Sequence, residues 1–560
     1  MTKLNFTNIK NSKLKTVFLF GCVFALMMAA VSCLEFFLPT NGADSAVFYK
    51  RVIIGLGFNL IFSFAFAFAL FILPENLRKI VFVLVAIVCV VFVTISALHF
   101  YIYKQLLAAP SLMVLFDTDF GEAAEFVDFY ASSATLTLGI IAFLLMLVIA
   151  ICAWKLSKKV FSLGLTKLYA LLALMLATVL GYVGWDKIYF TLDNPIPFIA
   201  QVAKPVISQR AEYKKILKSK PKFSHAKMTH TSKDPATHVI IIGESATKSH
   251  MSVYGYDRET NPNIKKPIAD MQMLIAQDAC SSRNATFASI VEIMLGSSDQ
   301  LKFEKNGAAP SNMVSIIQDA GYKTYWISNQ PGAGYGSMVS FWSASVDKAE
   351  FLNKRDYRVG YDFDGVLFPP LKNALKDKAP HKVIVLHMMG SHPGYKQRYP
   401  KIFEQWRDAD EVPNSVARRN EPSFNKATLN AYDNSMLYSD YVIAEVLRLA
   451  KTYQVDSVVY FSDHGQNLGE KNSHVGHSTE NGPKQGFEVP LIFWINNKSE
   501  KLALHDKKFK ENLLKPYSLE RIQYTLFDLY GIALPKRQDD KSLFSDSYLV
   551  TERRCDQLKD

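Results

Sequence analysis

Acidic and imidazole side chains follow three apolar runs that lie far apart in the sequence. Glu244 comes directly after HVIIIG, and His387 is the last residue of KVIVLH, with His392 a few positions later. Asp463 and His464 come directly after SVVYFS. If these runs are parallel strands of one sheet, their carboxyl ends meet at one edge and bring the five side chains together.

Oxygen and imidazole ligands without a thiolate suit a catalytic zinc ion, and they suit manganese less well. Asp463 could instead cap the following helix while His464 fills a loop, which is the more common role of an isolated Asp-His pair. His474 and His477 also lie near the end of the third run. So many candidate ligands near predicted strand ends favour a metal site over the purely structural role.

A segment rich in hydroxyl groups, DACSSRNATFAS (278–289), could supply a nucleophile. A metal lowers the pKa of a hydroxyl beside it, so an alkoxide becomes available near neutral pH. A helix is predicted from about Phe287, which places Thr286 at a helix N-terminus, where backbone N–H groups favour a phosphate. Thr286 could also be only the N-cap. The spacing leaves four candidates open: Thr286, Ser281, Ser282 and Ser289.

Two further apolar runs, YKTYWIS (322–328) and VPLIFWI (489–495), complete the set of predicted strands. The runs are nearly continuous in β-branched and aromatic residues, and they alternate with helical segments. This pattern is typical of a parallel sheet that helices cover on both faces. The sequence therefore predicts an α/β domain with a mainly parallel sheet over residues 237–560.

The first third of the chain is dominated by long apolar runs. Five stretches approach the roughly 20 apolar residues that a membrane-spanning helix needs: Thr16–Leu34, Val52–Leu73, Ile80–Tyr103, Ala131–Trp154 and Leu168–Trp185. The first is too long for the apolar part of a signal peptide. We predict a transmembrane domain of five helices over residues 1–187, and then a basic linker with an interfacial helix over residues 188–236.

Charges in the short loops set the predicted orientation. Lysine and arginine residues crowd the N-terminal tail and the turns after the second and fourth spans, whereas the loop after the third span is acidic. The positive-inside rule places the N-terminus in the cytoplasm and, after five crossings, residues 237–560 on the outer side. Much of the net charge of +12 lies in these loops and in the linker. Because no nucleic-acid-binding signature accompanies that charge, no nucleic-acid partner is expected.

Cysteine usage limits the covalent cross-links of the outer domain. Four of the six cysteines lie inside the predicted spans, which leaves Cys280 and Cys555. These two could form one disulfide in an oxidising compartment, but a framework of several bridges is excluded.

Five motifs together resemble those of the phosphoethanolamine transferases in the alkaline-phosphatase/sulfatase superfamily. They are IIGESAT, YGYDRETNPN, CSSRNATFAS, HMMGSHPGYKQRYP and FSDHGQNLGE with HVGH after it. The resemblance covers nearly the whole chain, including the predicted spans. It implies a protein of the bacterial inner membrane with an alkaline-phosphatase-like domain in the periplasm. We expect a monomer.

The resemblance also implies roles for the residues at the sheet edge. The implied ligands of one or two zinc ions are Glu244, Thr286, Asp463 and His464, and Thr286 would be the nucleophile that becomes phosphorylated. The implied catalytic histidines are His392 and His477, and the implied substrate-binding histidines are His387 and His474. Local spacing leaves the last family histidine open between His474 and His477, and we favour His477.

The acidic loop LFDTDFGEAAEF resembles a loop that helps these enzymes to hold the headgroup of the lipid donor. Thr118 and Glu122 match that pattern, and Glu122 could pair with the ethanolamine ammonium group. An ordinary solvated amphipathic helix would have the same pattern of charged and apolar residues. Val114 stands where lipid A-modifying members have Asn, and those members also have several disulfides. Both departures favour the lipopolysaccharide core or a periplasmic glucan over lipid A as the acceptor.

The implied reaction moves phosphoethanolamine from phosphatidylethanolamine to a lipopolysaccharide or glycan acceptor through a phosphothreonine. The alternatives are a phosphoglycerol transferase and a sulfatase-like hydrolase. Cys280, in CSSRNA, lacks the proline and the arginine spacing of a sulfatase nucleophile, which argues against the hydrolase. A catalytically inactive envelope scaffold is the alternative from another functional class.

Overall fold

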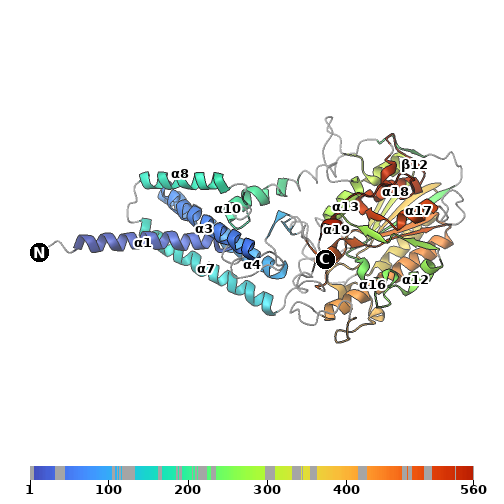
Figure 1. Ribbon diagram of the computed structural model, residues 1–560, viewed down its shortest axis with the longest axis horizontal. Coiled ribbons are helices and arrows are strands. Elements are labelled where there is room, and N and C mark those ends of the chain that lie inside the picture. The colour runs from blue at the N-terminus through green and yellow to red at the C-terminus, as the bar shows by residue number, and fades with distance from the viewer. Residues whose placement is uncertain are drawn as a thin grey trace. The chain divides into compact units, whose positions relative to one another are not determined.

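The computed structural model describes most of the chain: residues 5–31, 45–103, 133–161, 167–184, 192–204, 224–228, 235–270, 272–296, 310–330, 345–353, 362–413, 426–469, 482–496, 507–536 and 538–558, with a few isolated residues between them. The chain divides into two compact units (Figure 1). One comprises residues 1–112 and 130–209, and the other contains residues 210–560.

The described part of the first unit contains five long helices that overlap the five predicted spans: α1 (Asn5–Met28), α3 (Ser45–Ala69), α4 (Glu75–Tyr103), α7 (Ser133–Phe161) and α8 (Lys167–Gly184). Its shorter elements are η1 (Leu70–Ile72), α10 (Pro195–Phe198) and the π-helix η2 (Ile199–Ala203). The interfacial helix expected in the linker, around residues 209–218, lies outside the described residues except for Ala211.

Three of the five helices are long and apolar enough to cross a membrane, over Val52–Ile72, Glu75–Ile102 and Ala134–Val160. The other two contain shorter apolar segments, Lys15–Met28 and Leu168–Gly184. The chain is therefore a membrane protein, and the count of five spans stays a prediction.

The second unit is built on a seven-stranded sheet with the strand order β3–β10–β8–β2–β7–β5–β6. In chain order the strands are β2 (Ala236–Gly243), β3 (Met273–Ile275), β5 (Lys323–Ser328), β6 (Lys348–Phe351), β7 (His381–His387), β8 (Ser457–Ser462) and β10 (Leu491–Ile495). The five strands from β8 to β6 run parallel, as predicted. In register, Ile242 pairs with His387 and Gly243 with Ser462, so the strands β7, β2 and β8 end side by side.

The prediction of a mainly parallel sheet holds only in part, because β10 runs antiparallel to β8 and β3 runs antiparallel to β10. A strand parallel to β8 would require the chain to return to the end of the sheet where β8 begins. Instead, β10 begins where β8 ends, because Leu491 pairs with Phe461, and η11 (Lys484–Gly486) and β9 (Glu488–Val489) precede it. The sheet is therefore mixed.

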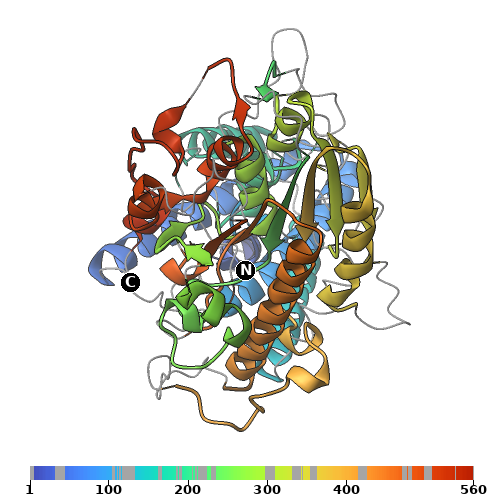
Figure 2. The same cartoon turned by 90° about the vertical axis from the view of Figure 1, so that its right-hand side faces the viewer.

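Helices cover both faces of this sheet. Side chains along a strand point alternately to opposite faces, so one strand contributes residues to two hydrophobic cores. Ile240 and Ile242 pack in one core with α13 (Thr286–Leu295), α14 (Met313–Asp319) and α18 (Ile522–Leu529). Val239 and Ile241 pack in a second core with α12 (Pro262–Ala269), α15 (Phe368–Lys376) and α16 (Lys426–Thr452). The long orange helix in Figure 2 is α16.

Smaller elements complete the unit. A three-stranded sheet joins β4 (Asp278–Cys280) to β9 and β11 (Pro516–Ser518), and β1 (Lys227–Met228) pairs with β12 (Ile532–Ala533). The remaining helices are α17 (Lys507–Leu513), α19 (Arg554–Gln557), η3 (Lys248–His250), η4 (Ser252–Tyr254), η8 (Asp364–Leu367), η9 (Tyr395–Gln397), η10 (Lys401–Phe403), η12 (Leu519–Arg521) and η13 (Asp539–Lys541).

Cys280 and Cys555 form the single disulfide that the cysteine count allowed. It ties α19 to β4, the strand that leads into the hydroxyl-rich segment. Arg553 supports the same junction, because its guanidinium donates to the backbone oxygen of Asp278 at 2.8 Å and to its carboxylate at 2.9 Å. The C-terminal helix is thus anchored beside the segment that carries Thr286.

Candidate active site

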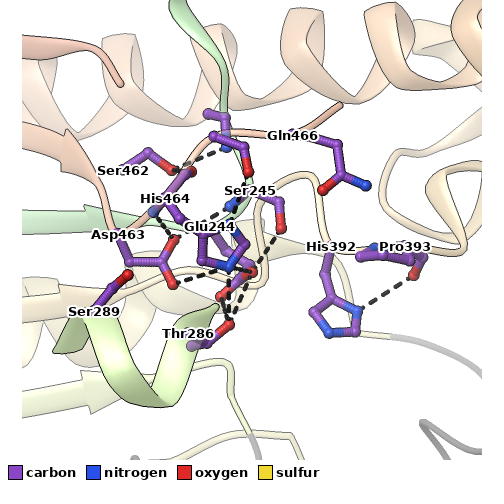
Figure 3. Close-up of polar contacts among 12 residues, drawn as sticks. Glu244, Ser245, Thr286, Ser289, His392, Pro393, Ser462, Asp463, His464 and Gln466 are labelled. Carbon is purple, nitrogen blue, oxygen red and sulfur yellow. Dashed lines mark hydrogen bonds and ion pairs between the residues drawn. The ribbon is translucent and has the colours of Figure 1, made fainter. Parts of the chain in front are cut away.

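Glu244, Asp463 and His464 form a compact triad at the carboxyl end of the sheet (Figure 3). One ligand atom from each residue lies within 4.8 Å of the others, and all three side chains are buried. Glu244 follows β2 and the other two follow β8, its parallel neighbour. Adjacent parallel strands that end together therefore bring together residues more than 200 positions apart.

Thr286 places its hydroxyl on this triad. Its Oγ1 lies 3.1 and 3.2 Å from the two carboxylate oxygens of Glu244 and 3.2 Å from Nε2 of His464. α13 begins at Thr286 itself, and Ala285 is the N-cap without a side-chain cap. The alternative role of Thr286 as an N-cap is therefore wrong.

Two of the other candidate hydroxyls are used elsewhere. The Ser281 hydroxyl donates to the backbone oxygen of Asp463 at 2.7 Å, and that of Ser289 donates to the backbone oxygen of Arg283 at 2.9 Å. Both bonds fix the loop before α13. The geometry thus favours Thr286 among the four candidates that the spacing had left open.

Hydrogen bonds orient each member of the triad. Nδ1 of His464 lies 2.8 Å from the backbone oxygen of Gly465, so a proton on Nδ1 leaves the lone pair of Nε2 facing Glu244 and Thr286. Oδ1 of Asp463 accepts the N–H of His464 at 2.7 Å. The Ser245 hydroxyl donates to Glu244 at 2.7 Å. Nε2 of His464 lies 3.3 Å from Oε1 of Glu244 and 3.5 Å from Oδ2 of Asp463.

The negative charge of the two carboxylates in the triad favours binding of a cation. Burial and the nearby charge of Glu244 raise the pKa of the Asp463 carboxyl well above its usual range. Burial would lower the pKa of His464, but Asp463 and Glu244 outweigh it and raise that pKa to about 9. Among the described residues, Oδ2 of Asp463 is buried and makes no hydrogen bond. Two carboxylates, one imidazole and a hydroxyl fit zinc as a catalytic ion.

Zinc affinity is expected to increase with pH between about 6 and 8. The pKa of His464 is about 9, so the imidazole carries a proton in this range that zinc must displace. One displaced proton changes the dissociation constant about tenfold per pH unit. Calorimetry of zinc binding to the full chain, in buffers with different ionisation enthalpies, would count the released protons. A zinc affinity that does not change with pH would contradict the prediction that zinc displaces a proton from His464.

The loop after β7 carries the next two predicted site residues. His387 is fully buried, and neither ring nitrogen has a hydrogen-bond partner among the described residues. Burial lowers the pKa of His387 to about 4, so the ring is neutral at physiological pH. His392 is half-buried, with Nδ1 3.3 Å from the backbone oxygen of Pro393, and lies near enough to lower the pKa of Glu244 when charged.

Four predicted site residues lie outside the described part of the chain: His474, His477, Thr118 and Glu122. Val114 also lies outside it. Gly476 is described, and its N–H donates to the backbone oxygen of Asn467 at 2.8 Å.

The sequence analysis missed several residues that hold the triad in position. Nε2 of Gln330 lies 2.9 Å from the backbone oxygen of Met388 and 3.5 Å from Glu244. Gln330 stands just after β5, so the rule that selected Glu244 could have found it. The Tyr432 hydroxyl on α16 donates to the backbone oxygen of Ser245 at 2.7 Å and accepts the N–H of Thr247. Nothing in the sequence pairs α16 with this loop.

Gly390→Ala is expected to weaken the site. Gly390 has a φ of +52°, and an added Cβ would lie 2.8 Å from the backbone oxygen of Glu244 and 2.9 Å from its nitrogen. We expect a loss of about 1–3 kcal/mol in stability together with weaker zinc binding, because Glu244 must shift. The control is Gly255→Ala, which has a φ of +98° but no atom within 4 Å. If both variants bind zinc like the wild type in a metal titration, Gly390 does not position Glu244.

Comparison with known proteins identifies a family and relatives of this chain. The Sulfatase family model matches residues 236–532, slightly more than half of the chain. The chain is 26% identical over 524 residues to phosphoethanolamine transferase EptC of Escherichia coli strain K12, which covers 89% of this chain and 88% of EptC. It is 27% identical to phosphoethanolamine transferase CptA of Salmonella typhimurium, with the same coverage.

Solved structures show the same likeness. The C-terminal periplasmic domain of Escherichia coli EptC, in complex with Zn, matches 60% of this chain and 92% of its own with 26% identity and a TM-score of 0.54. The integral membrane protein EptA from Neisseria meningitidis covers 94% of this chain and 97% of its own with a TM-score of 0.69. At 17% identity, that second match shows the fold alone. The chain belongs to the sulfatase family.

Proposed function

We propose that this membrane protein transfers phosphoethanolamine from phosphatidylethanolamine to a lipopolysaccharide or glycan acceptor in the cell envelope. The observation that carries the proposal is the hydroxyl of Thr286 at the start of α13, in contact with both Glu244 and His464. Similarity over 89% of the chain to proteins named phosphoethanolamine transferase supplies the transferred group.

Zinc would be held by Glu244, Asp463 and His464, with the Thr286 oxygen as a fourth ligand. The zinc complex of the EptC domain supports this choice of ion over manganese. When bound, zinc would lower the pKa of the Thr286 hydroxyl and offset negative charge on the phosphoryl oxygens.

In the first step, Oγ1 of Thr286 forms a bond to the donor phosphorus, and the bond from phosphorus to the diacylglycerol oxygen breaks. The hydroxyl proton has an acceptor at hand, because Thr286 already donates to Glu244. The leaving oxygen needs a proton, which we assign to a histidine, His392 or His477. Because α13 begins at Thr286, its N-terminal N–H groups would be available to bind the phosphoryl group.

In the second step, an acceptor oxygen attacks the phosphothreonine, and the bond to Thr286 breaks. Phosphoethanolamine leaves on the acceptor, the same histidine takes the proton of the acceptor hydroxyl, and Thr286 regains the proton that Glu244 had accepted. His387 and His474 would bind the substrate near the phosphoryl group. Two successive transfers through one residue predict ping-pong kinetics.

The membrane unit would keep the site at the surface where the donor is concentrated. We place the N-terminus in the cytoplasm and residues 237–560 in the periplasm, after five helices in residues 1–187 and a linker at 188–236. Thr118 and Glu122 would hold the donor headgroup, with the Glu122 carboxylate on the ammonium. The single disulfide and Val114 favour the lipopolysaccharide core or a periplasmic glucan over lipid A.

The test uses the full chain in proteoliposomes with phosphatidylethanolamine labelled in its headgroup, beside vesicles with labelled phosphatidylglycerol. Release of diacylglycerol and movement of the label to added lipopolysaccharide or glucan, only from the first lipid, are expected. Mass spectrometry of the acceptor would give its identity. Transfer from phosphatidylglycerol instead would make the protein a phosphoglycerol transferase, and transfer from neither lipid would refute the proposal.

A further inference from the structure

A second buried carboxylate, Asp364, lies on the loops around the triad. It opens η8 and is only 2% exposed. Its Oδ1 accepts the N–H of Met389 at 2.8 Å and the side-chain amide of Asn329 at 3.0 Å. Its Oδ2 accepts the N–H of Gly390 at 2.8 Å. Asp364 therefore joins the loops that follow β7 and β5.

The loop that Asp364 holds is in turn fastened to Glu244. The backbone of Gly390 packs so tightly there that an added Cβ would meet the backbone of Glu244 at 2.8 Å. Ser391 donates its N–H to the backbone oxygen of Glu244 at 2.9 Å. His392 follows directly, and its N–H donates to the backbone oxygen of Met389. One carboxylate thus fixes the backbone on which both Glu244 and His392 depend.

This arrangement needs both oxygens of a carboxylate. Burial raises the pKa of the Asp364 carboxyl, which shows the cost of keeping a charge there, and the three donors offset part of that cost. A neutral amide has one oxygen, so it would turn an N–H donor toward Met389 or toward Gly390. The loop would then lose one of its two backbone anchors.

We propose that Asp364 is a positioning residue: its carboxylate holds the Met389–His392 loop against Glu244 and so fixes the zinc ligand and the neighbouring histidine for transfer. The proposal rests on the function proposed above. It predicts that losing the carboxylate loosens zinc and slows chemistry while the donor binds as before.

The chain contains a matched control. Asp440 on α16 is also fully buried, and it too accepts two backbone N–H groups and one asparagine amide, all from Asn263 and Ile264 at the start of α12. Within the described part of the chain, no hydrogen bond or ion pair links Asn263 or Ile264 to the triad. Asp440→Asn therefore reproduces the loss of a buried, satisfied carboxylate without the link to Glu244.

The experiment compares Asp364→Asn and Asp440→Asn with the wild type as zinc-loaded full chains. For Asp364→Asn we expect zinc release to a chelator to be about 10–100-fold faster and kcat to fall by a similar factor, with KM for phosphatidylethanolamine within about twofold. For Asp440→Asn we expect a comparable loss of thermal stability, but zinc release and kcat within about twofold of the wild type.

Equal zinc release and equal kcat in Asp364→Asn and the wild type, or equal losses in both variants, would overturn the positioning role. Should Asp364→Asn not accumulate, Asp364→Ser removes the charge with a smaller side chain and must show the same faster release. Zinc release does not require turnover, so it decides the question even if the wild type transfers no phosphoethanolamine.

Discussion

Thr286→Ala is expected to lower phosphoethanolamine transfer about 10⁴–10⁶-fold, because it removes the oxygen that bonds to phosphorus. The fold should survive, since Thr286 is the first residue of α13 and provides no helix cap. The measurement is transfer of headgroup label from phosphatidylethanolamine by the purified full chain. Intact mass spectrometry should detect a phosphoethanolamine adduct on the wild type and none on the variant.

Two further variants serve as controls for the Thr286→Ala result. Ser282→Ala removes a hydroxyl from the same segment at a half-buried position and should leave transfer within about twofold, because this hydroxyl does not bond to phosphorus. Thr286→Ser keeps an oxygen at the site and should retain measurable transfer. An adduct that persists in Thr286→Ala, or transfer at the wild-type rate, would move the nucleophile to another residue.

Asp463→Asn is expected to have the second largest effect. The change removes a carboxylate that faces Glu244 and His464, so zinc affinity should fall at least about 100-fold and transfer with it. Zinc at 1,000 times its dissociation constant stabilises a folded protein by about 4 kcal/mol. Added zinc should therefore raise the melting temperature of the wild type clearly and that of Asp463→Asn far less.

Without zinc, the order of stability should reverse. Burial and the charge of Glu244 raise the pKa of Asp463, which means that the empty site destabilises the fold as a carboxylate forms there. At pH 7, zinc-free Asp463→Asn should thus melt at or above zinc-free wild type. Asp546→Asn, at an exposed position, is the control and should leave both melting temperatures unchanged. Zinc-dependent stabilisation of Asp463→Asn equal to the wild type would exclude Asp463 as a ligand.

The sequence alone determined where the site would form. Glu244 and the Asp463–His464 pair each follow a buried strand directly, and parallel strands that end at one edge must bring such residues together. The five apolar helices could also be predicted, because a long apolar run is visible in the sequence itself. The single disulfide could be predicted because only two cysteines lie outside the apolar runs.

Tertiary structure decided what residue types leave open. Periodicity indicates that a strand is buried but not its direction, and only the pairing of β10 with β8 decided that β10 runs antiparallel. Spacing could not choose between Thr286 and its neighbouring serines, because the choice depends on which hydroxyl the start of α13 turns toward Glu244. Asp364 carries no local signal, because the backbone groups that it holds belong to loops distant in the sequence.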